Sequence, residues 1–162
     1  MTQVYVGVGS NIDREANIRS GIAALRRAFG EVVVSTVYET EPVGFEANNF
    51  YNLVIGFDTE LSVRDVAQRL HRIEEHHGHE HRSSHLSSRT LDLDLLLYDD
   101  LVVHEADLDV PRPDVTRYAF VLRPLSEIAG DAVHPETGKR IAEIWRSYAG
   151  STAKMWPVKF PV

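Results

Sequence analysis

The sequence predicts an α+β protein in which helices pack on a largely antiparallel sheet. Apolar residues recur at two-residue steps, as in strands, in some segments and at three- and four-residue steps, as in helices, in others. The two kinds of segment do not alternate strictly, as they would in a parallel sheet built from βαβ units. Neither an internal repeat nor a linker is visible, so residues 1–162 are expected to form a single domain.

Composition narrows the class of protein. Hydrophobic residues make up 43% of the chain and charged residues 25%, which is ordinary for a soluble domain. The net charge of -7 argues against a protein that binds nucleic acid or an anionic membrane over its whole surface, so small-molecule partners are expected. The chain has no cysteine, which excludes disulfides and a thiol nucleophile. Neither a signal peptide nor a membrane span is recognisable, and the cytoplasm is the expected compartment.

The first half of the chain predicts three strands and two helices. The expected elements are a strand at 4–8, a helix at 14–29, a strand at 31–39, a loop at 40–49, a strand at 50–58 and a helix from 63 to near 78. The first helix has apolar residues at helical spacing and Gly30 where it should stop. Ser62, with Asp65 three residues later, is typical of a helix cap. Pro42, Gly44 and paired asparagines indicate the loop.

The second half begins with a polar stretch, 74–88, that is expected to be a mobile loop. Six of the eight histidines lie between His71 and His85. Strands are then expected at 92–98 and around 101–103, separated by an acidic turn, and a helix at 114–128.

Two carboxylates interrupt the apolar run that follows this loop. Side chains alternate along a strand, so Asp92 and Asp94 should project from one face while leucines 91, 93, 95 and 97 line the other. Two adjacent carboxylates repel each other, and a bound cation relieves the repulsion. Oxygen ligands of this kind suit Mg²⁺ shared with a phosphorylated substrate. The alternative is an amphipathic edge strand with a wet acidic face.

Several motifs, in order and at matching spacing between residues 3 and 129, resemble one enzyme family. They are Tyr-Val-Gly-Val-Gly-Ser-Asn-Ile, Val-Tyr-Glu-Thr-Glu-Pro-Val-Gly, Phe-Tyr-Asn, Arg-Ile-Glu, Arg-Thr-Leu-Asp-Leu-Asp and Ala-Phe-Val-Leu-Arg-Pro-Leu. The chain is similar to the 6-hydroxymethyl-7,8-dihydropterin pyrophosphokinases of folate synthesis. The resemblance implies a ferredoxin-like, three-layer αβα sandwich and an enzyme that passes the β and γ phosphates of MgATP to the pterin hydroxymethyl group, leaving AMP.

The resemblance also implies roles for individual residues. Asp92 and Asp94 would hold two Mg²⁺ ions, and Arg89 would contact the transferring phosphates as a third catalytic residue. Pterin binding would fall to Thr40, Pro42, Val43, Phe50, Asn52 and Phe120, with Phe50 and Phe120 stacking on the ring and Asn52 reading its edge. Nucleotide binding would fall to His71, Glu74, Arg82, Arg89, Arg112, Arg117 and Tyr118. The protein is expected to act as a monomer.

The chain departs from the family pattern in its charges. The basic, Trp-containing loop that usually precedes Arg89 is replaced by a segment with histidines and serines. A customary Pro-His pair is Pro111-Arg112, and a customary arginine is Tyr118, with Arg117 beside it. These changes leave two alternatives: a diverged, non-catalytic pterin- or nucleotide-binding relative, and a metal-binding protein built on His77, His79 and His81.

Overall fold

The computed structural model describes residues 1–42, 48–78, 90–152 and 154–160. The helices and strands are β1 (Thr2–Ser10), α1 (Arg14–Phe29), β2 (Val33–Val34), β3 (Val37–Thr40), β4 (Phe50–Thr59), α2 (Val63–His76), β5 (Asp92–Tyr98), β6 (Val103–Glu105), β7 (Leu108–Val110), α3 (Asp114–Arg117), α4 (Ala119–Ala129), α5 (Ile141–Arg146) and β8 (Met155–Val158).

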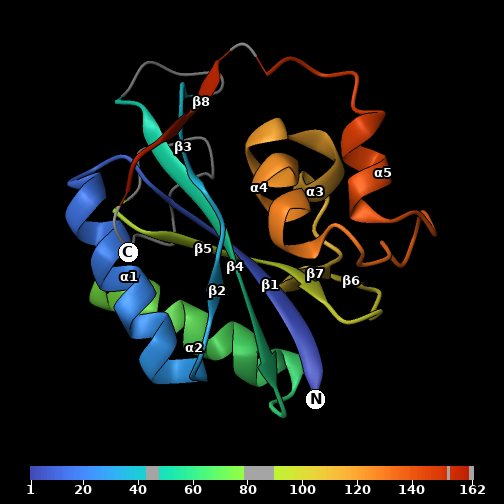
Figure 1. Ribbon diagram of the computed structural model, residues 1–162. Helices are drawn as coiled ribbons and strands as arrows, with labels where there is room; N and C mark the ends of the chain where they lie inside the picture. The colour runs from blue at the N-terminus through green and yellow to red at the C-terminus, as the bar shows by residue number, and fades with distance from the viewer. Residues whose placement is uncertain (43–47, 79–89, 153, 161–162) are drawn as a thin grey trace.

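The central sheet has the strand order β5-β1-β4-β3-β8, with β2 paired to β4, and all its pairings are antiparallel. Helices α1 and α2 cover one face, and α3, α4 and α5 cover the other (Figure 1). The predicted α+β class and the three-layer αβα sandwich are therefore confirmed. The remaining strands, β6 and β7, form a separate hairpin.

The three central strands sort their side chains by parity. On β1 the even-numbered residues, and on β4 and β5 the odd-numbered ones, enter the core beneath α1 and α2. This core includes Val4, Val6, Val8, Ile18, Ile22, Leu25, Leu53, Ile55, Phe57, Val66, Leu70, Ile73, Leu91, Leu93 and Leu95. The opposite parity faces the second core with α4, or is left to line a cavity.

Leu97 departs from the predicted alternation. It packs in the second core with Leu96 and Leu122. The alternation of side chains along the strand predicts instead that it shares a face with leucines 91, 93 and 95. The pairing of β1 and β5 shifts between Tyr5 and Val6, and this irregularity changes the parity for the end of β5. The shift lies beyond Asp94, so both aspartates keep a common face.

Helix α1 spans the predicted 14–29, and Gly30 follows with a positive φ of 86°. Helix α2 begins after Ser62, whose side chain accepts a hydrogen bond from the Asp65 backbone N–H at 3.2 Å, as the cap motif predicts. The prediction of a loop at 74–88 is wrong at its start, because α2 continues through His76 and Glu74 is one of its buried residues. Residues 79–88 of that expected loop lie outside the described residues.

Three other expected elements differ in detail. The strand expected at 31–39 is two short strands, β2 and β3, because Ser35 between them bonds to Val54 through both its backbone N–H and its hydroxyl. The helix expected at 114–128 is divided at Tyr118, which has extended dihedral angles. The strand expected around 101–103 is instead the hairpin of β6 and β7.

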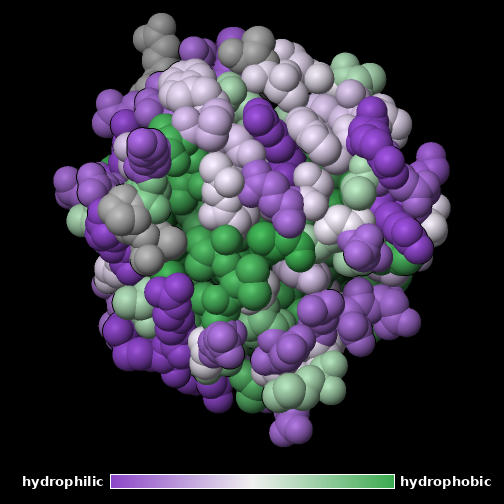
Figure 2. Space-filling model, viewed as in Figure 1, coloured by the Kyte–Doolittle hydropathy of each residue, from purple (hydrophilic) through white to green (hydrophobic). Residues whose placement is uncertain are grey.

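Most of the large apolar side chains are enclosed between the layers. Those of the described residues that stay exposed are scattered: Met1, Ile12, Val33, Val102, Val133 and Trp156. In the view of Figure 2, an apolar area lies near the middle of the face and is surrounded by hydrophilic residues. Among the described residues, no helix is both long enough and apolar enough to cross a membrane.

Candidate active site

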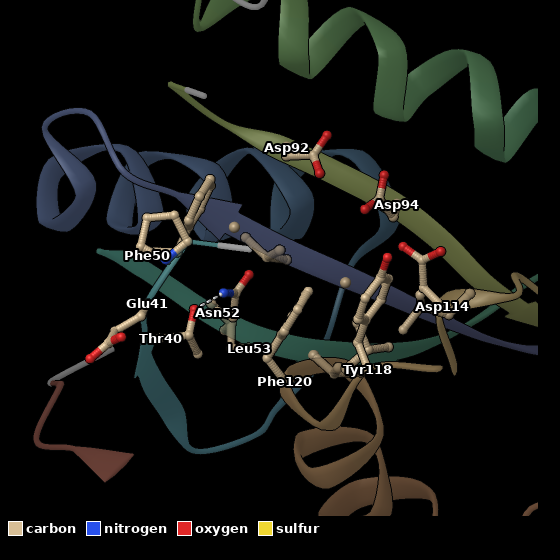
Figure 3. A pocket seen from close by; sticks show the side chains of 17 residues that line it. Thr40, Glu41, Phe50, Asn52, Leu53, Asp92, Asp94, Asp114, Tyr118 and Phe120 are labelled. Carbon is tan, nitrogen blue, oxygen red and sulfur yellow. Dashed lines mark hydrogen bonds between the residues drawn. The ribbon is translucent and has the colours of Figure 1, made fainter. Parts of the chain in front are cut away.

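A cavity opens on the α4 side of the sheet, where the ends of several strands meet the start of α4 (Figure 3). Its floor is the β1 backbone at Gly7 and Gly9, between β4 and β5. The lining residues are Gly7, Val8, Gly9, Thr40, Glu41, Pro42, Phe50, Asn52, Leu53, Val54, Asp92, Asp94, Leu96, Asp114, Tyr118, Phe120 and Val121. Eight of the residues predicted from the sequence therefore share one cavity: Thr40, Pro42, Phe50, Asn52, Asp92, Asp94, Tyr118 and Phe120.

Asp92 and Asp94 project from β5 to the same side of the cavity, as the alternation predicts (Figure 3). Burial raises the pKa of Asp94 well above its usual value, and the neighbouring Asp92 carboxylate raises the pKa further. Because the side chain of Asp94 is still 26% exposed, its burial is incomplete, and the rise in its pKa is due to the Asp92 charge as well as to burial. The two carboxylates thus repel each other, and a bound cation would relieve that repulsion.

Arg112 lies beside this pair and partly offsets its charge. Its Nη2 is 3.5 Å from Asp94 Oδ1, and its Nε donates to Asp114 Oδ2 at 3.3 Å. The Arg112 backbone N–H donates to Leu96 O at 2.9 Å, which ties this segment to β5. The Arg112 guanidinium thus interacts with the carboxylates of Asp94 and Asp114 and, at longer range, with that of Asp92. These four side chains together carry a net negative charge when all three carboxylates are ionised.

The donor set fits Mg²⁺ bound together with a phosphorylated ligand. Carboxylate oxygens are the ligands that Mg²⁺ prefers, and it usually keeps several waters or substrate phosphates as well. Within the described ranges, no group of three or more His, Asp or Glu side chains could hold a metal ion by itself. Asp92 and Asp94 would therefore supply part of a coordination shell that phosphate oxygens and water complete.

The other half of the cavity suits a flat ring with polar edges. Phe50 extends from β4 and Phe120 from the first turn of α4, and both rings are half-buried (Figure 3). Phe120 stacks on Tyr118 with ring centroids 5.0 Å apart and an interplanar angle of 17°. Asn52 Nδ2 donates to Thr40 Oγ1 at 2.7 Å, which fixes the orientation of the amide. Stacking surfaces and an oriented amide are what recognition of a heterocycle requires.

The remaining predicted residues lie elsewhere. Glu74 is buried against β5, and His71 beside it is largely exposed. Arg117 is exposed and does not line the cavity, although its backbone carbonyl accepts a hydrogen bond from the Tyr148 hydroxyl at 3.0 Å.

Three predicted residues, Val43, Arg82 and Arg89, lie outside the described residues. Two of the three histidines of the metal hypothesis, His79 and His81, also lie outside them. The third, His77, has its Nδ1 2.7 Å from Ile73 O and its Nε2 2.8 Å from Ser20 Oγ. Both ring nitrogens of His77 are therefore engaged within the protein.

Sequence reasoning missed several residues of the cavity. Asp114 was read as the start of a helix, yet its carboxylate faces the same cavity as the aspartate pair. Gly7 and Gly9 are not among the predicted site residues, yet they line the cavity, and their lack of side chains leaves its floor open. The sequence signal is the glycine at every second position, which leaves one face of this strand without side chains. In the structure this bare face lies beside Asn52 and Asp94, because Gly9 pairs with Asn52 and Gly7 with Asp94.

Comparison with known proteins gives a family match over most of the chain. Residues 5–130 match the family model described as 7,8-dihydro-6-hydroxymethylpterin-pyrophosphokinase (HPPK). Two similar curated proteins are named 2-amino-4-hydroxy-6-hydroxymethyldihydropteridine pyrophosphokinase. The one from Aquifex aeolicus is 34% identical over 145 residues, which are 88% of this chain and 90% of that protein. The one from Bacillus subtilis is 34% identical over 154 residues, which are 90% of this chain and 92% of that protein.

Solved structures with the same fold are also found. A crystal structure of wild-type HPPK-DHPS from Plasmodium falciparum matches 91% of this chain with a TM-score of 0.71 and 15% sequence identity. The A437G form of that protein matches the same share with a TM-score of 0.73 and 13% identity. This chain spans less than half of the length of those chains, 44% and 45%. At this identity the likeness shows the fold alone.

Proposed function

This chain belongs to the 7,8-dihydro-6-hydroxymethylpterin-pyrophosphokinase family, and we propose that it transfers pyrophosphate from ATP to 6-hydroxymethyl-7,8-dihydropterin through the cavity beneath α4. The products are AMP and the pterin diphosphate, an intermediate of folate biosynthesis. We propose, as expected from the sequence, that the protein acts as a monomer in the cytoplasm.

One observation carries this proposal: the acidic pair of β5 and the aromatic slot line the same cavity. Asp92 and Asp94 lie at the end near Asp114, and Phe50, Asn52 and Phe120 lie at the other (Figure 3). A pterin held in the slot would present its hydroxymethyl group toward the acidic end. That arrangement places the acceptor alcohol and the phosphate donor side by side.

The transfer needs no nucleophilic side chain, because the hydroxymethyl oxygen of the pterin attacks ATP directly. A bond forms between the hydroxymethyl oxygen and the β phosphorus of ATP, and the bond from that phosphorus to the oxygen retained by AMP breaks. The proton of the hydroxymethyl group is released to water. Catalysis of such a transfer depends on positioning and on charge neutralisation. Two Mg²⁺ ions, when bound, would supply neutralisation of the phosphate oxygens and alignment of donor and acceptor.

The protein's own groups then have separate tasks. Asp92 and Asp94 hold the cations, and Asn52 and the two phenylalanines orient the pterin. Arg112 carries a permanent charge beside Asp94, where it can face the phosphates of the nucleotide. Its guanidinium supplies part of the positive charge that the basic loop provides in the usual family pattern. Arg89 is proposed to contact the transferring phosphates.

The direct test is to mix the pure protein with MgATP and 6-hydroxymethyl-7,8-dihydropterin and to follow AMP by chromatography. We expect AMP and the pterin diphosphate in equal amounts, and no AMP when either the pterin or Mg²⁺ is left out. Calorimetry with each ligand alone separates the alternatives. A non-catalytic relative would bind the pterin and release no AMP, and that result would contradict the proposal.

The close approach of Gly9 to Asn52 gives a prediction about pterin affinity. A Cβ at Gly9 would lie 2.7 Å from Asn52 Oδ1, so Gly9→Ala is expected to shift the amide and disturb its hydrogen bond with Thr40. We expect about tenfold weaker pterin binding by calorimetry, the loss expected when a buried polar recognition contact is removed.

A double-mutant cycle isolates the cause of that loss. If Gly9→Ala acts through Asn52, it should add little in an Asn52→Ala background, because the displaced group is already gone. An equal loss in both backgrounds would mean that the new methyl group itself fills the slot, and it would contradict the role given to Asn52.

A further inference from the structure

The peptide between the two aspartates has a second anchor outside the cavity. Glu74, on α2, is only 5% exposed, and its Oε2 accepts a hydrogen bond from the Leu93 backbone N–H at 2.8 Å. Leu93 is the residue between Asp92 and Asp94. A carboxylate from the opposite layer of the sandwich therefore holds the backbone that carries both proposed metal ligands.

The topology explains why this N–H needs a side-chain partner. Among the strands of the described residues, β5 lies at the edge of the sheet and pairs with β1 alone. Edge strands leave alternate backbone groups without a strand partner, and buried ones must find another acceptor. The Leu93 side chain is buried in the core with α2, so α2 fixes both the amide and the side chain of this residue.

Stability alone is a poor explanation for a carboxylate at this position. Burying a carboxylate costs more than burying an amide or an aliphatic group of similar size. A charged acceptor makes a shorter and stronger hydrogen bond than a neutral one, which favours positional precision. His71 Nδ1, 3.5 Å from Glu74 Oε1, lies on the outer side of the same carboxylate.

We propose that Glu74 is a positioning residue, which fixes the Leu93 peptide so that the Asp92 and Asp94 carboxylates point into the cavity at the spacing their cations require. The inference rests on the proposed function of the aspartate pair. It differs from the direct nucleotide contact expected for Glu74 from the resemblance, and the experiment below separates the two roles. Glu74 lies outside the set of cavity-lining residues, so its effect passes through the strand.

The test compares Glu74→Ala with Glu74→Gln, whose amide oxygen can still accept the Leu93 N–H. Tyr98→Phe is the matched control, because it removes a side-chain hydrogen bond at the far end of β5, from Tyr98 Oη to Leu61 O. Three quantities are measured: exchange of the Leu93 amide hydrogen by NMR, affinity for Mn²⁺ alone and with α,β-methylene-ATP, and the Mg²⁺ dependence of AMP formation.

In Glu74→Ala we expect faster exchange at Leu93 and about 10–100-fold weaker Mn²⁺ binding, the range seen when a group that orients metal ligands is lost. Pterin affinity should stay near that of the wild type. Glu74→Gln should recover most of the loss, and Tyr98→Phe should change none of the three quantities.

Two outcomes would overturn the inference. Faster exchange at Leu93 with unchanged Mn²⁺ affinity would make Glu74 a structural residue only. A raised KM for ATP in both Glu74 variants, without a change in Mn²⁺ affinity, would make it a nucleotide contact. Exchange and Mn²⁺ binding need no turnover, so a wild-type protein that forms no AMP would overturn the proposed function while leaving this inference open to its own measurement.

Discussion

Asp94→Asn is expected to reduce AMP formation by more than about 100-fold, because groups that merely orient metal ligands already account for about 10–100-fold. The variant keeps the shape of the side chain and removes the charge that is proposed to hold the cation. Asp92→Asn should have an effect of similar size. The rate of AMP release at saturating MgATP and pterin is the quantity to measure.

Neither variant should be less stable than the wild type in the absence of divalent cations. The two carboxylates repel each other across one face of β5, and removing one charge relieves that repulsion. Asp92→Asn is the cleaner of the two, since it leaves the contact of Arg112 with Asp94 intact. Thermal unfolding in EDTA measures the effect.

Asp58→Asn provides a control with the same loss of charge. Asp58 lies near the opposite end of β4 from Phe50 and does not line the cavity. We expect normal AMP formation from this variant. If Asp92→Asn and Asp94→Asn also turn over normally, the phosphate-binding site lies elsewhere in the chain.

Phe120→Ala is expected to weaken pterin binding by about 5–150-fold, which corresponds to the roughly 1–3 kcal/mol that an aromatic surface contributes to stacking with one base. The loss has two parts. The ring proposed to stack on the pterin is removed, and Tyr118 loses the ring on which it stacks with centroids 5.0 Å apart. Calorimetry with the pterin alone measures the change without requiring turnover.

Phe160→Ala is the matched control for the loss of a phenylalanine ring. Phe160 is half-buried like Phe120, but it packs edge-on against Tyr51, with centroids 5.7 Å apart, and does not line the cavity. We expect unchanged pterin affinity from this variant. Equal losses in the two variants would indicate a general effect of destabilisation and would argue against a stacking role for Phe120.

Local patterns in the sequence predicted much of the fold. Helix α1 and the start of α2 follow from apolar spacing, a glycine stop and a serine cap, all of which are contained within the elements themselves. Strand β8 is not among the predicted elements, and it contains Pro157, a residue type that is disfavoured in strands. The strand is tolerated because β8 lies at the edge of the sheet.

The acidic pair could be predicted because both aspartates reside in one short motif, whereas the residues of the slot lie in three motifs and were expected only from the family resemblance. Contacts between residues of distant segments could not be predicted from the sequence. Arg112 reaches Asp94 through a segment tied to β5, and Glu74 reaches the Leu93 amide across the interface of α2 with β5. The shift of register at Tyr5, which moves Leu97 to the other core, likewise depends on pairing and leaves no local signal.

The central claim is that Asp92 and Asp94 hold the cations that join the triphosphate to its acceptor. The most direct measurement is a crystal structure with Mn²⁺, α,β-methylene-ATP and the pterin, in which anomalous scattering locates the metal. The account predicts Mn²⁺ on the carboxylates of Asp92 and Asp94, with the pterin between Phe50 and Phe120. Mn²⁺ bound at another site, with these carboxylates free of metal, would contradict it.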